Sequence, residues 1–423
     1  MSNLKKYRFC DLYTMSSGIS TTKDQAGHGS PFLSFSVVFN NYFVPDELTD
    51  LMATSDKEKD TYSIKSGDIF LTRTSEVVDE LAMSCVAIKD YPNASYSGFL
   101  KRLRPIQTDI TYSKFMAFYL RSPMFRKTMT NNAVMTLRAS LNEAIFSYLD
   151  LRLPDFDDQV KAGDLLYLLN EKIEINKRIN AELEAMAKTL YDYWFVQFDF
   201  PDANGKTYKT SGGKMVYNPI IKRDIPEGWE AGTLEDLGQI VGGSTPSTQS
   251  SENFTTEGTP WITPNDLSNN QGNKFISRGR QDVSTEGIKS ASLKKYPAGT
   301  VLLSSRAPIG YMAISRNEVT TNQGFKSFIP NKGYSSEFIY YTVKNSLKAI
   351  TQYASGSTFK EVSGGTLKTV KVVLPKMNVS DAFKKKVQSI FSKQDFIERE
   401  NAQLTQLRDW LLPMLMNGQV TVK

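Results

Sequence analysis

The residue types that most often perform catalysis or bind metals are scarce in this chain of 423 residues. His28 is its only histidine, and it stands in the loop-like sequence QAGHGSP. A metal site built from several histidines is therefore excluded, and no cluster of cysteines or carboxylates replaces it. A histidine-based catalytic triad would need His28 as its base, and the surrounding sequence favours an ordinary loop residue instead.

Motifs for nucleotide chemistry are also missing. Asn-Gly-Lys-Thr at residues 204–207 ends like a phosphate-binding loop, but the first glycine of such a loop would fall on Phe200. No GxGxxG pattern follows a predicted strand, and we find no Asn/Asp-Pro-Pro-Tyr box for base methylation and no nuclease-like cluster of carboxylates and lysine. The sequence therefore favours a binding subunit, with no metal or cofactor of its own, over an enzyme.

An internal duplication predicts two similar binding units. Leu153-Pro154 recurs as Leu374-Pro375, and the stretch after each pair aligns without a gap at an offset of 221 residues. A repeat of this length indicates a duplicated domain with its helix rather than a solenoid unit. Two similar units suit a target with two half-sites, and DNA is the commonest such target.

Positive charge is unevenly distributed along the chain, whose formal net charge is +6. Residues 99–138 and residues 274–316, one segment in each half, are rich in lysine and arginine and poor in acidic residues. A polyanion such as DNA would explain two such segments, although either one alone could equally be a solvated surface.

Polar residues on predicted loops of both halves could contact DNA, because base readout needs donors and acceptors that reach a groove. The candidates are Thr72, Arg73, Thr74, Tyr96, Ser97, Thr136 and Arg138 in the first half, and Ser304, Ser305, Arg306, Asn322, Gln323, Ser357, Thr358 and Lys360 in the second. The serines and threonines could equally be turn or capping residues. Arg73 and Arg306 are the strongest candidates, because arginine can bind guanine or a phosphate.

Short motifs recur in the same order and predict two similar α+β domains, at residues 1–152 and 229–373. GSPFLSFSVV at Gly29 parallels GTPWITPNDL at Gly258, and SGDIFLTRT parallels AGTVLLSSR. SGFLKRLRP at Ser97 parallels QGFKSFIPN at Gln323. SGDIFLTRT predicts a turn that leads into a strand, LDLRLP alternates like a half-buried strand, and SKFMAFYLRSPMFRKTM predicts a helix broken near Pro123.

A long helix is predicted after each domain, over residues 153–200 and 374–423, with a Gly- and Pro-rich linker at 201–228 between the halves. Apolar residues recur at three- and four-residue spacing in both helices, which predicts that they pack as an antiparallel coiled coil, although each could instead lie on its own domain. The predicted seam consists of Leu166, Leu169, Ile173, Asn180, Leu183, Leu190, Val387, Ile390, Ile397, Asn401, Leu404 and Leu411. Asparagines within a seam cost stability but can fix its register.

Two features bear on where the protein works. Cys10 and Cys85 are its only cysteines and have no metal or redox spacing, so a reducing cytoplasm is the simplest interpretation. No apolar run reaches the roughly 18 residues needed to span a bilayer.

Taken together, these motifs resemble the specificity subunit of type I restriction-modification systems. The resemblance covers essentially the whole chain and is carried by the duplication, GTPWITPNDL, AGTVLLSSR followed by APIG, TNQGFKSFIP, GSTFKEV, and the helix ends LYDYWF and LRDWLLPMLMNG. It implies that each domain is a target-recognition domain for one half of a split double-stranded DNA sequence. It also implies that the helices separate the two halves and dock two methyltransferase subunits, through which motor-nuclease subunits join. S-adenosylmethionine, ATP and magnesium would be used by those partners.

Geometry agrees with a helical spacer. From Leu166 to Trp194 an α-helix extends about 42 Å, which matches roughly 12 base pairs of B-DNA, or about one turn. We therefore expect that one added heptad in both helices would lengthen the unspecified spacer of the target, and an unchanged spacer would contradict this expectation.

Other functions remain compatible with the sequence. A specificity subunit of another restriction class, with nuclease and methylase fused in one partner, would share these features. A coiled-coil scaffold with two protein-binding heads is disfavoured by the paired basic segments, and salt-dependent DNA binding would distinguish it.

Overall fold

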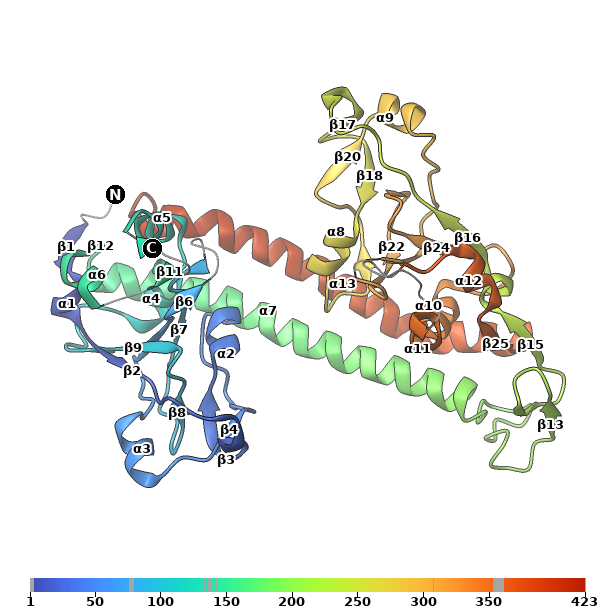
Figure 1. The fold of residues 1–423 in the computed structure, drawn as a ribbon, viewed down its shortest axis with the longest axis horizontal. Helices are drawn as coiled ribbons and strands as arrows, with labels where there is room; N and C mark the ends of the chain where they lie inside the picture. Colours follow the sequence, from blue (N-terminus) through green and yellow to red (C-terminus); the bar gives the residue numbers. More distant parts are fainter. Residues whose placement is uncertain are drawn as a thin grey trace. The chain divides into compact units, whose positions relative to one another are not determined.

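The computed structural model describes residues 4–75, 80–132, 134–135, 139–140, 143–306, 308–352 and 361–422. The chain forms two compact units, unit 1 with residues 1–174 and 402–423 and unit 2 with residues 175–401. Each unit contains one mixed head and a stretch of both long helices (Figure 1). We call the heads head 1 (residues 5–153) and head 2 (residues 230–374). None of the helices in the described ranges could cross a membrane.

Head 1 consists of short strands and short helices in alternation. Its strands are β1 (Lys5–Arg8), β2 (Tyr13–Ser17), β3 (Ala26–Leu33), β4 (Leu51–Met52), β5 (Ile69–Thr72), β6 (Thr74–Ser75), β7 (Ser84–Val86), β8 (Ser95–Tyr96), β9 (Leu100–Pro105), β10 (Val134–Met135), β11 (Ala139–Ser140) and β12 (Asp150–Leu153). Its helices are α1 (Phe9–Leu12), η1 (Lys23–Gln25), α2 (Phe35–Asn40), α3 (Asp56–Thr61), α4 (Ser113–Tyr119), α5 (Pro123–Asn132) and α6 (Glu143–Tyr148).

In its described residues, head 1 contains three sheets, one of them with the order β10-β11-β6, and a closing strand pair. The central sheet has the order β2-β9-β5-β7, and a smaller sheet has the order β4-β3-β8, in which β3 and β8 are parallel. β1 and β12 pair antiparallel, with Lys5 opposite Leu153, so the start of the head meets its end just before the long helix begins. The predicted strands in SGDIFLTRT and LDLRLP are present as β5 and β12, and Pro123 begins α5, as the predicted helix break requires.

Head 2 repeats this plan, and its central and smaller sheets each have one strand more than those of head 1. Its strands are β15 (Glu230–Thr233), β16 (Gln239–Gly242), β17 (Phe254–Thr255), β18 (Thr259–Ile262), β19 (Phe275–Ile276), β20 (Gln281–Val283), β21 (Val301–Leu303), β22 (Met312–Ser315), β23 (Thr320–Thr321), β24 (Lys326–Ile329) and β25 (Lys371–Leu374). Its helices are η4 (Leu234–Leu237), η5 (Ser251–Asn253), α8 (Pro264–Asn269), α9 (Thr285–Ser290), α10 (Ser336–Asn345), α11 (Leu347–Gln352) and α12 (Gly364–Thr369).

The topology of head 2 confirms the predicted duplication and the α+β class. Its central sheet, β16-β24-β21-β22-β19, extends the order of head 1 by one strand, and β15 pairs with β25 as β1 pairs with β12. In the smaller sheet β18 and β23 are parallel, as β3 and β8 are. Phe32 and Leu33 on β3 therefore correspond to Trp261 and Ile262 on β18, which supports the parallel between GSPFLSFSVV and GTPWITPNDL.

The segment predicted as a linker is instead a folded part of unit 2. It contains the hairpin β13 (Met215–Asn218) and β14 (Arg223–Pro226). Ile225 is buried in the largest core of unit 2, and Phe200 stacks on Tyr208 at 4.6 Å and on Trp229 at 4.9 Å between ring centroids. The Gly- and Pro-rich composition reflects the tight turns of this segment, whereas its few apolar residues anchor it.

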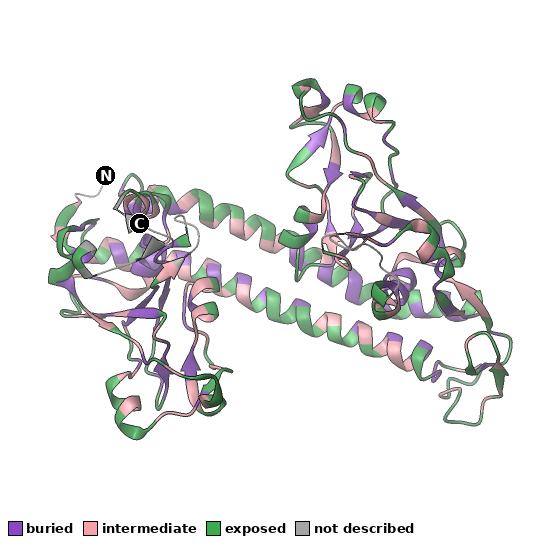
Figure 2. Ribbon diagram, viewed as in Figure 1, coloured by how far each residue is buried: buried purple, intermediate pink, exposed green. Residues whose placement is uncertain are grey.

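The two long helices, α7 (Phe156–Tyr191) and α13 (Met377–Met416), pack antiparallel within each unit. In unit 2, Asn176 Nδ2 donates to Asn401 Oδ1 at 2.8 Å, and in unit 1, Arg408 Nη1 donates to Asn170 Oδ1 at 3.4 Å. α7 ends in a single π-helical turn, η3 (Asp192–Val196). Figure 2 shows exposed and buried surfaces alternating along both helices. Of the predicted seam residues, Leu166, Ile173, Asn180, Val387, Ile390 and Ile397 are buried, and Leu169, Leu183, Leu190, Asn401, Leu404 and Leu411 are half-buried.

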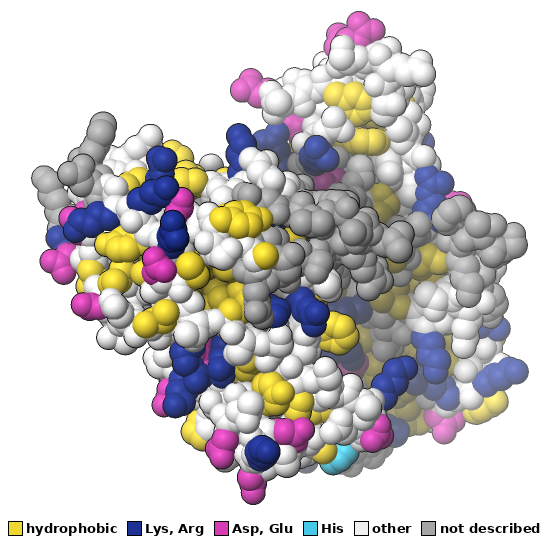
Figure 3. Space-filling view, turned by 60° about the vertical axis from the view of Figure 1, so that its left-hand side comes forward, with side chains coloured by type: hydrophobic (Ala, Val, Ile, Leu, Met, Phe, Trp, Pro, Cys, Tyr) yellow, Lys and Arg dark blue, Asp and Glu magenta, His cyan; other side chains and the backbone are white. Residues whose placement is uncertain are grey.

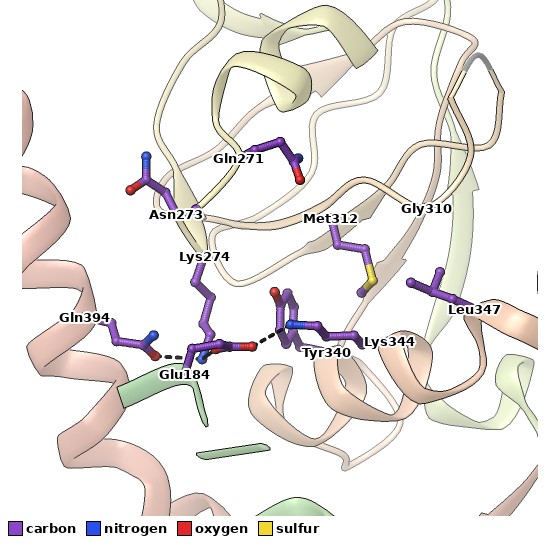
Figure 4. Close-up of a pocket in the computed structure, with 11 residues that line it drawn as sticks. Glu184, Gln271, Asn273, Lys274, Gly310, Met312, Tyr340, Lys344, Leu347 and Gln394 are labelled. Carbon is purple, nitrogen blue, oxygen red and sulfur yellow. Dashed lines mark hydrogen bonds and ion pairs between the residues drawn. The ribbon is translucent and has the colours of Figure 1, made fainter. Parts of the chain in front are cut away.

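A buried lysine connects head 2 to the helices within unit 2. Lys274 Nζ lies 2.7 Å from Glu184 Oε2 on α7, and it donates to Gln394 Oε1 on α13 at 2.7 Å and to Tyr341 Oη at 2.8 Å. Lys344 Nζ lies 2.6 Å from Glu184 Oε1. Figure 4 shows Lys274, Glu184, Lys344 and Gln394 converging beside a cavity of about 180 Å³. Because a buried cation is tolerated only when paired and hydrogen-bonded, this contact fixes head 2 on both helices.

The buried lysine predicts a pH dependence of stability. Burial lowers the pKa of Lys274 from 10.5 to about 8, although the attraction of Glu184 opposes this shift. Between these two values the unfolded chain binds more protons than the folded protein, so stability from this group rises with pH. We expect the melting temperature of the wild type, relative to Lys274→Met, to increase from about pH 8 to about pH 10. Thermal unfolding of both proteins across this range tests it, and a constant difference would contradict it.

Candidate nucleic-acid interface

Three loops meet at one end of the central sheet in each head. In head 1, Ile19 N donates to Tyr96 O at 3.0 Å, Gly98 N donates to Ile19 O at 2.7 Å, and Arg73 N donates to Phe99 O at 2.9 Å. These bonds bring together residues 18–20, 73–74 and 97–99, which we call loop edge 1. Because every junction uses backbone groups, the shape of the edge does not depend on which side chains it presents.

Head 2 builds the same arrangement. Ser244 N donates to Thr321 O at 3.0 Å, and Ser305 N donates to Gly324 O at 2.8 Å. The loops 243–245, 305–306 and 322–324 form loop edge 2. Trp261 Nε1 also donates to Ser244 O at 3.1 Å and so anchors the first of these loops to the smaller sheet.

The backbone bonds correct the alignment of the two repeats by one residue. Ser97 N donates to Leu33 O and Asn322 N donates to Ile262 O, both at 3.1 Å, so Ser97 corresponds to Asn322 and not to Gln323. The motif comparison was wrong here because it aligned the Gly-Phe pairs. The strand pairing instead matches two buried residues with each other. Leu100 lies opposite Thr72 in head 1, and Phe325 lies opposite Ser304 in head 2.

The strand register also shows that Arg73 and Arg306 occupy different positions in the two repeats. Thr74 pairs with Ser140, and Arg306 pairs with Glu361, so Thr74 and Arg306 occupy equivalent places. Arg73 therefore corresponds to Ser305, since each follows the last residue of the matched strand segment. This is the alignment that the parallel between SGDIFLTRT and AGTVLLSSR predicts, and both arginines belong to the edges.

Several predicted DNA-contacting residues are buried and support the edges from inside. Thr72 Oγ1 accepts a bond from Met83 N at 2.9 Å, and Ser304 Oγ accepts one from Tyr311 N at 2.8 Å. The hydroxyl of Tyr96 lies 2.9 Å from Ser16 Oγ. The predicted residues that are buried are Thr72, Tyr96, Ser97, Ser304 and Ser305, and DNA contact by their side chains stays a prediction.

The remaining described candidates reach the surface. Arg73 and Gln323 are exposed, and Thr74, Arg306 and Asn322 are half-buried. Asn322 Oδ1 accepts a bond from Gly324 N at 2.9 Å, which fixes its side chain, and Thr245 Oγ1 donates to Gln323 Oε1. The other candidates, Thr136, Arg138, Ser357, Thr358 and Lys360, lie outside the described residues.

The structure adds residues that motif comparison missed. Lys101 and Lys326 follow Leu100 and Phe325, so each edge has a lysine at the same place in the strand behind it. Lys101 is buried and donates to Ser17 Oγ at 2.8 Å, whereas Lys326 is half-buried. Gly18 and Gly243 are also equivalent, and each passes very close to a facing carbonyl oxygen, at 2.1 and 2.0 Å from the position of a Cβ atom. Both glycines directly follow the first strand of their central sheet, β2 or β16, and this shared place in the repeat is the signal that could have identified them.

Charge is mixed on the face that Figure 3 shows. Figure 3 shows lysine and arginine side chains interspersed with acidic ones over the visible face rather than gathered in one patch. Within the described ranges, no group of three or more His, Cys, Asp or Glu side chains could hold a metal ion. The edges are candidates for contacts made by a few specific side chains, whose positions the backbone hydrogen bonds fix.

Comparison with known proteins identifies the family. A family model, the type I restriction modification DNA specificity domain, matches residues 3–185 and again residues 226–407. The chain belongs to this family. Each match contains one head and most of the long helix that follows it.

Relatives in this family are specificity subunits. That of HindI from Haemophilus influenzae is 28% identical over 473 residues, covering 99% of this chain and 100% of the relative. That of MjaIX from Methanocaldococcus jannaschii is 40% identical over 198 residues, which is 46% of this chain and 44% of the relative. Specificity subunits are non-catalytic, so this chain is a non-catalytic subunit of a type I system.

A solved structure shares the fold. The specificity subunit from M. genitalium aligns over 98% of this chain and 96% of its own length, with a TM-score of 0.61 and 14% sequence identity. Two heads with two long helices are therefore the architecture of a type I specificity subunit.

Proposed function

We propose that this subunit recognises a split double-stranded DNA sequence, with loop edge 1 contacting one half and loop edge 2 the other. The single observation that carries this proposal is that the same backbone-bonded edge is built twice with different exposed side chains. Duplicated geometry suits the similar backbone of two half-sites, whereas the differing side chains supply different base contacts.

The helices supply a surface for partner subunits. Ile175 on α7 and Phe396 on α13 are exposed, as are Met186 on α7 and Leu407 on α13. Each pair is separated by 221 residues, the offset of the duplication. Exposed apolar side chains at repeat-equivalent positions favour two copies of one partner, which we propose to be methyltransferase subunits, with motor-nuclease subunits joining through them. S-adenosylmethionine, ATP and magnesium would be bound by these partners.

Co-expression with a methyltransferase subunit of the same system tests both parts. We expect the two proteins to co-purify and their complex to bind duplex DNA with an affinity that falls steeply as salt increases. Replacing Met186 and Leu407 together with glutamate should weaken co-purification. Salt-independent DNA binding, or no DNA binding by an intact complex, would contradict the proposal.

Arg306 allows a test of one half-site. We expect Arg306→Ala to reduce discrimination at the half-site read by head 2 by roughly 1–3 kcal/mol, because one arginine contact to guanine has about that value. Competition binding with DNA altered in either half measures the effect. Lys289→Ala, which changes an exposed lysine on α9 of the same head, is the control. Unchanged discrimination in Arg306→Ala would remove this residue from the interface.

A further inference from the structure

Loop edge 1 presents a phenylalanine to solvent. The side chain of Phe99 is 67% exposed, although aromatic side chains of this size usually lie in a core. Phe99 belongs to the turn between β8 and β9, directly before the strand that begins at Leu100. Sequence reasoning selected the polar neighbours of this residue and passed over the residue itself.

The turn holds Phe99 in a fixed position. Phe99 O accepts a bond from Arg73 N at 2.9 Å, and Phe99 N donates to Ser97 Oγ at 3.2 Å. On either side, Gly98 N donates to Ile19 O at 2.7 Å and Leu100 N donates to Ser97 O at 2.9 Å. These hydrogen bonds fix the backbone of the turn before a partner binds. The entropy cost of ordering this turn on binding is therefore reduced.

Head 2 has a glycine at the equivalent place. Ser305 N donates to Gly324 O as Arg73 N donates to Phe99 O. A Cβ atom on Gly324 would lie 2.9 Å from Pro264 Cγ and 3.5 Å from Arg306 Nε, so this space in head 2 is already taken. One scaffold position therefore carries a projecting phenyl ring in one head, whereas neighbouring proline and polar side chains fill the space in the other.

We propose that Phe99 is a specificity-determining residue that makes an apolar contact with a nucleobase in the half-site read by head 1. This inference rests on the proposed function. The exposed guanidinium of Arg73, whose backbone is bonded to Phe99, would hold the neighbouring phosphates while the ring reaches a base. Two apolar partners exist in duplex DNA: the methyl group of thymine and the face of a base at an opened step.

The test compares Phe99→Ala with wild type in the complex with the methyltransferase subunit, by competition binding. The competitors are the recognised duplex and the same duplex scrambled in the half read by head 1. We expect Phe99→Ala to lose roughly tenfold to a hundredfold in affinity for the recognised duplex, the size expected for one buried phenyl ring. Affinity for the scrambled duplex should stay within about twofold, because phosphate contacts dominate non-specific binding.

Two further variants control the test. Ile106→Ala removes another exposed apolar side chain, 50% exposed at the opposite end of β9, and should leave both affinities unchanged. Phe99→Leu keeps an apolar group and should recover most of the loss. Replacing each thymine of the half-site by uracil separates the two partners. A methyl contact predicts one substitution that weakens the wild type but not Phe99→Ala, whereas base stacking predicts none.

Distinct results overturn distinct claims. If the wild-type complex has no preference for a split sequence, the proposed function fails and this inference fails with it. If the wild type is selective and Phe99→Ala binds the recognised duplex within twofold of it, only the role of Phe99 is overturned. Equal losses on recognised and scrambled DNA would also overturn it, since they would indicate a general effect.

Discussion

Gly243→Ala should abolish discrimination at one half-site and leave the other intact. A Cβ atom on Gly243 would stand 2.0 Å from Thr321 O and 2.3 Å from Asn322 O, far inside contact distance. Both oxygens belong to backbone, and Thr321 O already accepts a bond from Ser244 N, so neither can move aside without displacing loop edge 2. We expect at least a tenfold loss of preference, about 1.4 kcal/mol, for the half-site read by head 2.

The neighbouring glycine is a matched control. A Cβ atom on Gly242 would meet nothing closer than Phe325 O at 3.6 Å, which is ordinary contact. Gly242→Ala should therefore bind as the wild type does. Gly18→Ala, whose Cβ would lie 2.1 Å from Ser97 O, should produce the corresponding loss at the opposite half-site. Competition binding with DNA altered in one half at a time measures all three variants. Equal effects of Gly243→Ala on both halves would contradict two independent edges.

Glu398→Ala should destabilise unit 2 strongly. The Glu398 side chain on α13 is 2% exposed and accepts bonds from the backbone N–H groups of Lys274 at 2.7 Å and Phe275 at 3.0 Å. Arg316 Nη2 also lies 2.8 Å from its second oxygen. Removing the carboxylate leaves these donors buried without their acceptor, and such a change costs roughly 3–5 kcal/mol. The melting temperature of the unit 2 transition should fall accordingly.

An exposed carboxylate on the same helix provides the comparison. Asp381→Ala, in the first part of α13, should change the melting temperature little, because exposed acidic side chains contribute little to stability. Circular dichroism during heating measures both variants. A shift for Glu398→Ala no larger than that for Asp381→Ala would show that the buried network does not hold head 2 on the helices.

The duplication was predictable because identical residues recur at a fixed offset and because apolar residues recur with helical spacing in both halves. The Leu-Pro pairs and the three-four spacing required no knowledge of the packing, and α7 and α13 begin within a few residues of those pairs. The hairpin within the supposed linker was not predictable in this way. Its place in the core depends on Ile225 and Phe200 meeting partners that are distant in the sequence.

The sequence predicted which loops come together in each head, but not which of their side chains are exposed. The predicted loops do meet in each head, but Thr72 and Ser304 form hydrogen bonds inside the protein, which the sequence of a strand end does not reveal. The motif alignment matched Ser97 with Gln323 instead of Asn322, because it followed the identical Gly-Phe pairs and not the pattern of buried residues. Phe99 was overlooked because an apolar residue next to a strand is expected to face the core, and only its 67% exposure shows otherwise.

The central claim is that each head reads its own half of one split sequence, and mapping of modified bases tests it most directly. The chain would be co-expressed with its methyltransferase subunit in a host without other methylation, and the modified bases would be mapped by long-read sequencing. We predict one split motif, absent without this chain, in which Gly18→Ala and Gly243→Ala relax opposite halves. A contiguous motif, a motif that persists without this chain, or the same half relaxed by both variants would contradict the claim.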